Sequence, residues 1–306
     1  MITAAALRQR LHTETPIVLD GALATELERR GCDLADALWS AKTLLEQPET
    51  IEAVHRDYFG AGAQVATTAS YQATPAGYAA RGMDEAAALD LIALSVRLAA
   101  SARDGGGAAD GLVAGSVGPY GAFLADGSEY RGDYDLSREE FVDFHRPRAA
   151  ALVDAGADLL AFETLPKLTE ALALADLAEE LGVPAWISFS LRDAASISDG
   201  TPLAEVARAL DGRAGVIALG VNCVPLEVVA PALEELAAHT SLPLVAYPNS
   251  GETYDPVTKT WGPGVQGAST LAELAPRWRD SGARLIGGCC RTTPADIAAL
   301  VEALRA

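Results

Sequence analysis

Three of the four cysteines in this sequence fall where side chains can act on a substrate. Cys223 ends the apolar segment 216–223, and Cys289 and Cys290 lie 66 and 67 positions later, at the end of the apolar segment 283–289. Three thiolates brought together suit a soft or borderline ion such as zinc. The residues alone leave two other readings open, since free cysteines also act as small buried hydrophobic groups and an adjacent pair can form a redox disulfide.

A zinc ion held by three protein ligands has one free tetrahedral position, which is typical of a catalytic rather than a structural site. A substrate thiol bound there would ionise more easily and stay nucleophilic at neutral pH. Cys32 follows Gly31 at the end of a predicted helix, with no strand before it. We therefore assign Cys32 no part in the site.

The elements that position these cysteines alternate regularly along the chain. Eight short apolar runs predict strands at 16–23, 64–70, 112–119, 158–165, 184–190, 216–223, 243–248 and 283–289. Amphipathic stretches predict helices at 50–60, 84–103, 138–155, 169–181, 202–210, 226–240, 271–281 and 294–304. Continuous apolar strands alternating with helices indicate a parallel sheet. Eight units favour a closed (β/α)8 barrel of the TIM type, which we expect to span residues 1–306 as one domain.

Glycines and loops distinguish the two ends of the predicted barrel. Gly62, Gly156 and Gly282, each followed by alanine, stand just before strands, where a glycine ends a helix and turns the chain. The loops 120–135 and 251–267 follow strands and carry aromatic residues, so they belong to the end where barrels build active sites. Either loop is a candidate lid.

Composition excludes several classes of protein. The formal net charge of −19 repels phosphate backbones and anionic lipids, so we expect no nucleic acid or membrane partner. No apolar run is long enough to span a bilayer, and residues 1–10 do not resemble a secretion signal. Four cysteines in 306 residues do not suggest a disulfide scaffold. We therefore expect a cytoplasmic protein.

Competing motifs are weak. The segment 262–267 matches a dinucleotide-binding glycine pattern but follows a polar loop instead of a strand, so we reject it. None of the four histidines ends a predicted strand, so none is a catalytic candidate. Neither a nucleophile elbow nor a phosphate-binding loop is present.

Several motifs resemble those of the homocysteine S-methyltransferase family. The sequences at 220–223, 247–252 and 287–294 (GVNC, YPNSGE and GGCCRTTP) are similar to its characteristic cysteine motifs. The sequences at 20–22, 67–72 and 162–164 (DGA, TTASYQ and FET) match further family positions in the same order. The resemblance extends over essentially the whole chain.

The resemblance implies that Cys223, Cys289 and Cys290 bind Zn²⁺, which activates the thiol of homocysteine for methylation to methionine. It also implies that Asp20, Thr67 and Glu163 hold the amino-acid end of homocysteine and that Asn222 shapes the metal site. The residues agree with this, because Asp20 and Glu163 end predicted strands and could both pair with an ammonium group at the barrel mouth.

The methyl donor is expected to be a sulfonium, S-methylmethionine before S-adenosylmethionine. Betaine-using members of the family place an aromatic residue after the strand-four glutamate, where this chain has Thr164. Trp39, Tyr71 and Tyr130 are our candidates for contacting the cationic methyl group. The loop 124–134 also resembles that of sulfonium-using members and offers acidic residues for the donor's charge.

Four alternatives compete with this function. The chain could use betaine, act on a related thiol such as selenocysteine, or be a zinc-storing or thiol-redox protein without transferase activity. A cobalamin-dependent methionine synthase would need further domains for folate and cobalamin, for which 306 residues ending soon after the eighth strand leave no room.

Overall fold

Eight parallel strands form the centre of the protein. The computed structural model describes residues 4–13, 15–34, 39–106, 108, 110–252, 254–255, 260–262 and 269–305. The strands are β1 (Ile17–Val18), β2 (Val65–Thr67), β3 (Leu112–Val117), β4 (Leu159–Leu165), β5 (Ala185–Phe189), β8 (Val216–Asn222), β9 (Leu244–Tyr247) and β12 (Ala283–Ile286). Each pairs with its neighbours in the order β1-β12-β9-β8-β5-β4-β3-β2.

The two ends of this sheet meet. Leu19 forms a parallel bridge with Val65, and the Asp20 N–H donates to the Val65 carbonyl at 3.0 Å. Leu19 also donates to Ile286 of β12 at 2.8 Å. The eighth strand is thereby joined through β1 to β2, which confirms the predicted barrel.

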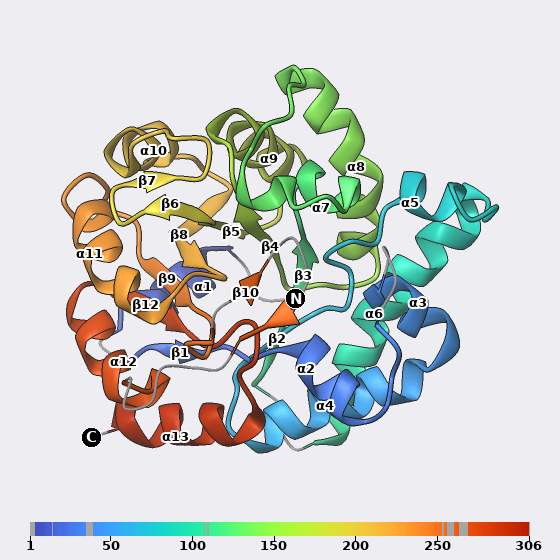
Figure 1. The fold of residues 1–306 in the computed structure, drawn as a ribbon, viewed down its shortest axis with the longest axis horizontal. Coiled ribbons are helices and arrows are strands. Elements are labelled where there is room, and N and C mark those ends of the chain that lie inside the picture. Colours follow the sequence, from blue (N-terminus) through green and yellow to red (C-terminus); the bar gives the residue numbers. More distant parts are fainter. Residues whose placement is uncertain are drawn as a thin grey trace.

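A ring of helices surrounds the strands (Figure 1). The predicted helices are all present, as α4 (Pro48–Gly60), α6 (Glu85–Gly105), α8 (Arg138–Asp154), α9 (Leu168–Leu181), α10 (Leu203–Leu210), α11 (Leu226–Ala237), α12 (Leu271–Asp280) and α13 (Pro294–Arg305). Their ends differ from the predicted ones by a few residues, and the strands are shorter than predicted. Patterns of apolar residues locate an element better than its ends, which depend on local capping.

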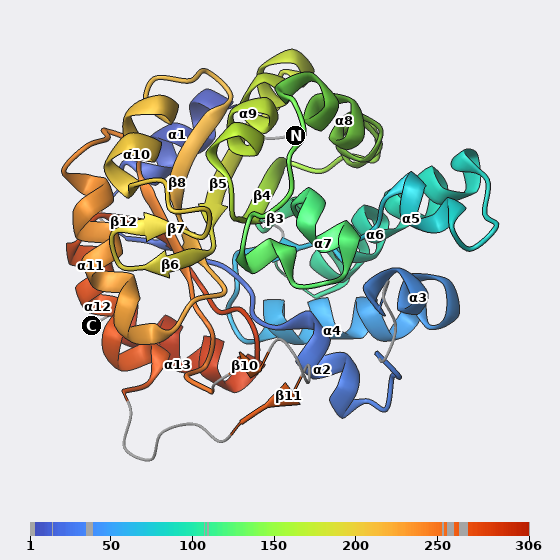
Figure 2. The same cartoon turned by 45° about the horizontal axis from the view of Figure 1, so that its top comes forward.

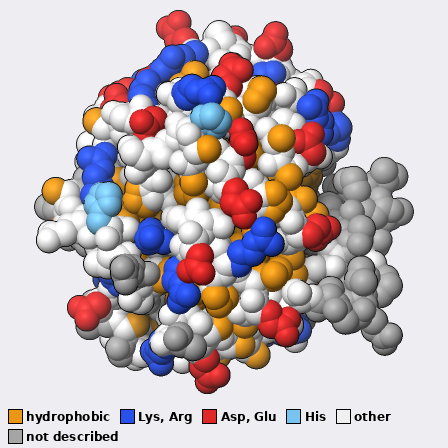
Figure 3. Space-filling view, turned by 90° about the vertical axis from the view of Figure 1, so that its left-hand side faces the viewer, with side chains coloured by type: hydrophobic (Ala, Val, Ile, Leu, Met, Phe, Trp, Pro, Cys, Tyr) orange, Lys and Arg blue, Asp and Glu red, His pale blue; other side chains and the backbone are white. Residues whose placement is uncertain are grey.

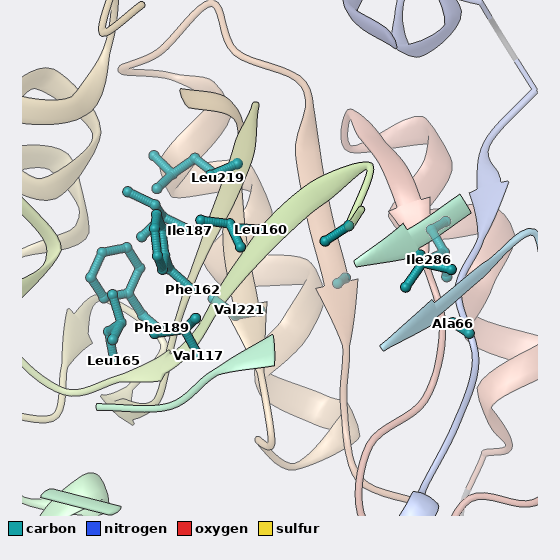
Figure 4. Packing of buried hydrophobic residues seen from close by; sticks show 14 of the residues in the cluster. Ala66, Val117, Leu160, Phe162, Leu165, Ile187, Phe189, Leu219, Val221 and Ile286 are labelled. Carbon is teal, nitrogen blue, oxygen red and sulfur yellow. The ribbon is translucent and has the colours of Figure 1, made fainter. Parts of the chain in front are cut away.

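Alternation along each strand separates the inside of the barrel from the layer beneath the helices. In β4, Leu160 and Phe162 pack in the outer layer, whereas Leu159 and Ala161 belong to the barrel interior. Figure 4 shows Phe162 and Leu165 of this outer layer close to Phe189 of β5. The same alternation turns Glu163 toward the interior, at the carboxyl end of its strand.

Several elements were not predicted from the sequence. The helix α1 (Ala4–Leu11) buries Leu7 and Leu11 among the residues of the barrel interior. In Figure 1 it lies behind the strands, and Figure 2 places it at the opposite end of the barrel from the hairpin β10 (Tyr254–Asp255) and β11 (Thr260–Trp261). The helix α1 therefore closes the end of the barrel away from the site.

The other unpredicted elements lie in the connections between strands and helices. They are α3 (Trp39–Glu46), α5 (Pro75–Ala79), α7 (Tyr120–Leu124), the 3-10 turn η1 (Ser128–Tyr130), and the hairpin β6 (Leu191–Asp193) with β7 (Ser196–Ile197), whereas α2 (Leu23–Arg29) agrees with the helix predicted to end at Gly31. Most are too short to show a helical or strand period in the sequence.

The predicted glycine turns are confirmed. Gly62, Gly156 and Gly282 have φ angles of 99°, 98° and 101°, a region that side chains disfavour. Each follows the last turn of a helix and precedes a strand.

The helices and the charged side chains of the described residues bear on the expectations from composition. Among the described residues, no helix is both long and apolar enough to cross a bilayer. On the face shown in Figure 3, acidic and basic side chains are interspersed despite the overall negative charge.

Candidate active site

The three cysteines meet at the carboxyl ends of the strands. The Cys223 and Cys290 sulfurs are 3.7 Å apart, and those of Cys289 and Cys290 are 4.0 Å apart. All three sulfurs lie within 4.8 Å of one another, and no other such group of metal-binding side chains occurs among the residues described. Cys32 is buried elsewhere and donates to Gln47 at 3.2 Å, so the structure keeps it apart from the cluster.

Close backbone contacts fix the position of these thiols. The Cys223 N–H donates to Tyr247 at 3.1 Å, and the Cys289 N–H donates to Pro248 at 2.7 Å. The last residue of β9 and the residue that follows it therefore link the ends of β8 and β12. Before Cys289, the chain turns in a space that only glycine fits: a Cβ on Gly288 would lie 2.3 Å from the Thr292 hydroxyl.

The sulfur geometry fits a tetrahedral zinc ion. Thiolates at about 2.3 Å from zinc lie about 3.8 Å from one another, close to the observed separations. The neighbouring thiols of Cys289 and Cys290 lower the pKa of Cys223 by hydrogen bonding, while the Cys223 sulfur raises the pKa of both neighbours. Because three thiolates this close repel one another, a divalent cation is what allows all three to ionise together.

Two buried carboxyl groups lie on the barrel side of the site. Asp20 accepts hydrogen bonds from the Thr67 N–H at 2.8 Å and from the Thr67 hydroxyl at 2.9 Å. Glu163 accepts from the Ser116 and Tyr247 hydroxyls. Burial raises the pKa of Asp20 to about 8 and that of Glu163 to about 7; the charge of Glu163 adds to the rise at Asp20, and that of Cys223 adds to the rise at Glu163. Neither carboxyl group has a cationic partner among the contacts described, which leaves them suited to a ligand's ammonium group.

A layer of polar side chains beneath these carboxyl groups was not predicted from the sequence. Ser188 contacts the Tyr247 hydroxyl at 2.6 Å and donates to Asn222 at 2.8 Å, and Trp186 donates to the Tyr247 hydroxyl at 3.0 Å. These side chains come from inward-facing strand positions near the site. The signal in the sequence is a polar residue at the inward position next to a strand's carboxyl end, as at Ser116 and Ser188.

Both polar atoms of the Asn222 side chain are hydrogen-bonded within the protein. Its carbonyl oxygen accepts the Thr164 N–H at 2.7 Å, and its amide donates to the Thr164 hydroxyl at 2.8 Å. Thr164 has a φ of 61°, which is rare outside glycine, so these bonds hold a strained turn. The Thr164 hydroxyl also bonds to Tyr71. Asn222 thus positions the turn after Glu163.

The loop after β3 reaches the cysteines. The Tyr130 hydroxyl lies 3.2 Å from the Cys223 sulfur. Burial raises the pKa of the adjacent Glu129, and the negative charge at Cys223 adds to this effect. One Glu129 carboxylate oxygen is buried without a hydrogen-bond partner in the described structure. The sequence predicts acidic residues for the donor's charge in this loop but does not single out Glu129.

Other predicted site residues are placed only in part. Trp39 begins α3, but its side chain lies outside the described residues, as does most of the loop 251–267 with the rejected glycine pattern. Of the histidines, His55 and His145 are buried in helices away from the cysteines.

Comparison with known proteins places this site in a family. The model of the family described as homocysteine S-methyltransferase matches residues 17–304. The chain belongs to the homocysteine S-methyltransferase family. All three cysteines, both buried carboxyl groups and the Tyr130 loop lie within the matched region.

Members of this family that are similar to the chain include two bacterial proteins. Homocysteine S-methyltransferase of Escherichia coli (strain K12) is 60% identical over 96% of this chain and 97% of its own length. Homocysteine S-methyltransferase YbgG of Bacillus subtilis (strain 168) is 55% identical over 94% of both chains. Both alignments extend over nearly the full length of either partner.

A solved structure of the family has the same fold. The metallated form of the homocysteine methyltransferase MmuM from Escherichia coli superimposes with a TM-score of 0.87, at 58% identity, over 96% of this chain and 98% of that one. The (β/α)8 barrel, predicted from the eight alternating strands and helices, is therefore confirmed.

Proposed function

We propose that this protein transfers a methyl group from a sulfonium donor to the thiol of homocysteine, forming methionine, with zinc as its metal. The observation that carries the proposal is the convergence of three cysteine sulfurs, at separations suited to tetrahedral zinc, beside two buried carboxyl groups without cationic partners. Thiol chemistry and recognition of an ammonium group thus occur in one place.

Cys223, Cys289 and Cys290 would hold the zinc ion, which supplies a site that lowers the pKa of a substrate thiol. Asp20 and Glu163 bind the ammonium group of homocysteine, and Thr67 keeps Asp20 in place through two hydrogen bonds. A bound ammonium group favours the ionised carboxylates, which burial alone disfavours. The substrate therefore completes a charge arrangement that the free site lacks.

Tyr71 and Tyr130 form the donor side of the site. Both rings contact groups at the mouth, Tyr71 through Thr164 and Tyr130 through Cys223. Aromatic faces attract a cationic methyl group by about 0.5 to 2 kcal/mol each. Glu129, whose buried carboxylate oxygen has no partner, adds a negative charge on the same side.

The transfer itself is a displacement that needs alignment more than acid or base catalysis. The homocysteine sulfur forms a bond to the methyl carbon while the donor's sulfur–methyl bond breaks, and the electron pair of that bond stays on the donor sulfur. The cationic sulfonium becomes a neutral thioether. Removing that charge weakens the hold of Glu129 and the aromatic rings on the spent donor.

A donor panel tests this function. Zinc-loaded protein is incubated with homocysteine and, separately, S-methylmethionine, S-adenosylmethionine or betaine, and methionine formation is measured. We expect the fastest turnover with S-methylmethionine. Faster turnover with betaine would overturn the choice of donor, and no methionine with any donor would overturn the transferase function. Selenocysteine offered in place of homocysteine tests the acceptor.

A further inference from the structure

A buried cluster of charged and polar side chains lies between helices α8 and α9, away from the cysteines. It consists of His145 and Arg148 on α8 and Glu170 on α9, which are 0%, 1% and 0% exposed. His145 contacts Arg148 at 2.8 Å through Nδ1 and Glu170 at 2.8 Å through Nε2. We call these three residues the α8–α9 cluster. Buried charges are costly to keep, and the methyl transfer does not use them directly.

Arg148 connects this cluster to the backbone of Tyr71. Its guanidinium donates to the Tyr71 carbonyl and to the Gly118 carbonyl, both at 2.7 Å. The Gly118 N–H also donates to the Tyr71 carbonyl at 3.1 Å, and a Cβ on Gly118 would lie 2.6 Å from the Tyr71 ring. The position of the Tyr71 ring is therefore fixed by Arg148 and by the close approach of Gly118.

Glu170 connects the cluster to both ends of the loop that carries Glu129 and Tyr130. One carboxylate oxygen accepts the Tyr120 N–H at 2.6 Å, and the other accepts the Tyr134 hydroxyl at 2.5 Å. Residues 120 and 134 bracket the segment that brings the Tyr130 hydroxyl to Cys223. A single carboxylate thus holds the base of the loop closed.

His145 joins the two halves of the cluster. Arg148 has only donors, so Nδ1 of His145 must accept, and Nε2–H then donates to Glu170. Burial lowers the pKa of His145, which agrees with this neutral tautomer. One neutral ring therefore satisfies both partners.

We propose that the α8–α9 cluster positions the donor side of the site, because it holds Tyr71 and the 120–134 loop in fixed positions relative to each other. This inference rests on the proposed function, in which Tyr71 and Tyr130 face the methyl donor. The homocysteine side depends on Asp20, Thr67 and Glu163, none of which contacts the cluster in the bonds described. Disturbing the cluster should affect the donor alone.

Three variants test the proposal. His145→Phe keeps a buried ring but removes both hydrogen bonds, whereas His145→Gln keeps one donor and one acceptor. His55→Phe makes the same replacement at a buried histidine on α4 whose ring nitrogens have no hydrogen-bond partner in the described structure, and it serves as the matched control. Each zinc-loaded protein is assayed for zinc content, for the KM of donor and homocysteine, and for amide hydrogen exchange.

We expect His145→Phe to raise the donor KM about tenfold or more, as for loss of hydrogen bonds to charged groups, while the homocysteine KM and zinc content stay unchanged. Exchange should speed up in residues 118–135 and not in the strands that carry the cysteines. His145→Gln should recover much of the loss, and His55→Phe should match the unmodified protein.

Besides unchanged exchange in residues 118–135, two results would overturn the proposal. One is an equal rise of both KM values or faster exchange throughout the barrel, which would mean general destabilisation. The other is faster exchange in 118–135 with an unchanged donor KM, which would make the cluster purely structural. If the unmodified protein formed no methionine from homocysteine with any of the donors, the proposed function itself would fail, separately from these results.

Discussion

Cys223 and Cys32 are both free thiols, but only one of them lies in the sulfur cluster. Cys223→Ala removes a ligand from a site where two sulfurs remain, so we expect metal binding to weaken and methyl transfer to be lost. Cys32→Ala is the matched control, because its thiol contacts Gln47 instead. Metal analysis of the purified variants by mass spectrometry checks this. Loss of metal in Cys32→Ala with retention in Cys223→Ala would contradict the site.

The raised pKa values of Asp20 and Glu163 predict a pH dependence of ligand binding. As pH falls from about 8 to about 6, both carboxylates gain protons and lose their attraction for an ammonium group, so binding weakens. Methionine is the suitable ligand, because it has no thiol to titrate. Calorimetry should show this weakening in the unmodified protein and a shallower dependence in Glu163→Gln.

At pH about 8, where the Glu163 carboxylate is ionised, the affinity of the same variant gives the magnitude of the contact. Loss of a charge-assisted contact costs about 1.5 to 3 kcal/mol, or about tenfold to 150-fold in affinity. Zinc content should stay full in Glu163→Gln and in Asp20→Asn. Unchanged affinity in both variants at pH about 8 would remove these carboxylates from the binding site.

Residue types at strand ends predicted that the three cysteines would converge, while the family resemblance pointed to the two carboxyl groups beside them. Their partners were less visible, because Ser116, Ser188 and Tyr247 lie on different strands and become neighbours only through the barrel's register. Serine and tyrosine are also common in ordinary strands. The pairing of each polar side chain with a carboxyl group depends on the tertiary structure, so no local sequence pattern predicts it.

Among the elements, the turn after β4 depends on one side chain of β8. Asn222→Ala would leave the Thr164 N–H without its acceptor. It would also remove a hydrogen bond that helps to hold the Thr164 backbone at its φ of 61°. A buried unsatisfied donor costs about 1 to 3 kcal/mol, so the free energy of unfolding should fall by about that amount. Ser188→Ala removes one hydroxyl contact to Asn222 and should cost less. Denaturant titration compares the two, and equal losses would argue against the strained turn.

Repeating elements were predictable because each strand and helix has its own period, while the connections were not. The 3-10 turn η1 spans three residues, and its place is determined by contacts of the loop, such as the Ser190 hydroxyl on the Glu129 carbonyl at 2.8 Å. Similarly, the α8–α9 cluster appears in the sequence only as a histidine, an arginine and a glutamate on helices. Such residues are usually solvated, and only packing shows otherwise.

At the scale of the whole molecule, α1 closes the barrel end opposite the site. Leu7→Ala or Leu11→Ala should each lower the free energy of unfolding by about 2 to 5 kcal/mol, the usual cost of a cavity at a buried leucine. Gln9→Ala, at an exposed position on the same helix, should change it little. Thermal unfolding with zinc content measured in parallel checks this. A loss of metal with no change in stability would contradict a purely structural role.

The helix α1 was missed because its eight residues are mostly alanine and charged or polar side chains, with only two leucines to bury. The barrel was predicted in spite of this, since closure is fixed by the number of repeating units and not by what covers either end.

The order of the proposed metal-binding residues along the chain has a consequence for synthesis. Cys223 leaves the ribosome well before Cys289 and Cys290, which come just after the strand that pairs with β1. A chain interrupted anywhere before residue 289 holds at most one of the three thiols. The complete set of thiols therefore cannot bind the metal until the last strand has been synthesised. A chain that retains the ion must have been translated beyond that strand, with its ring of strands closed.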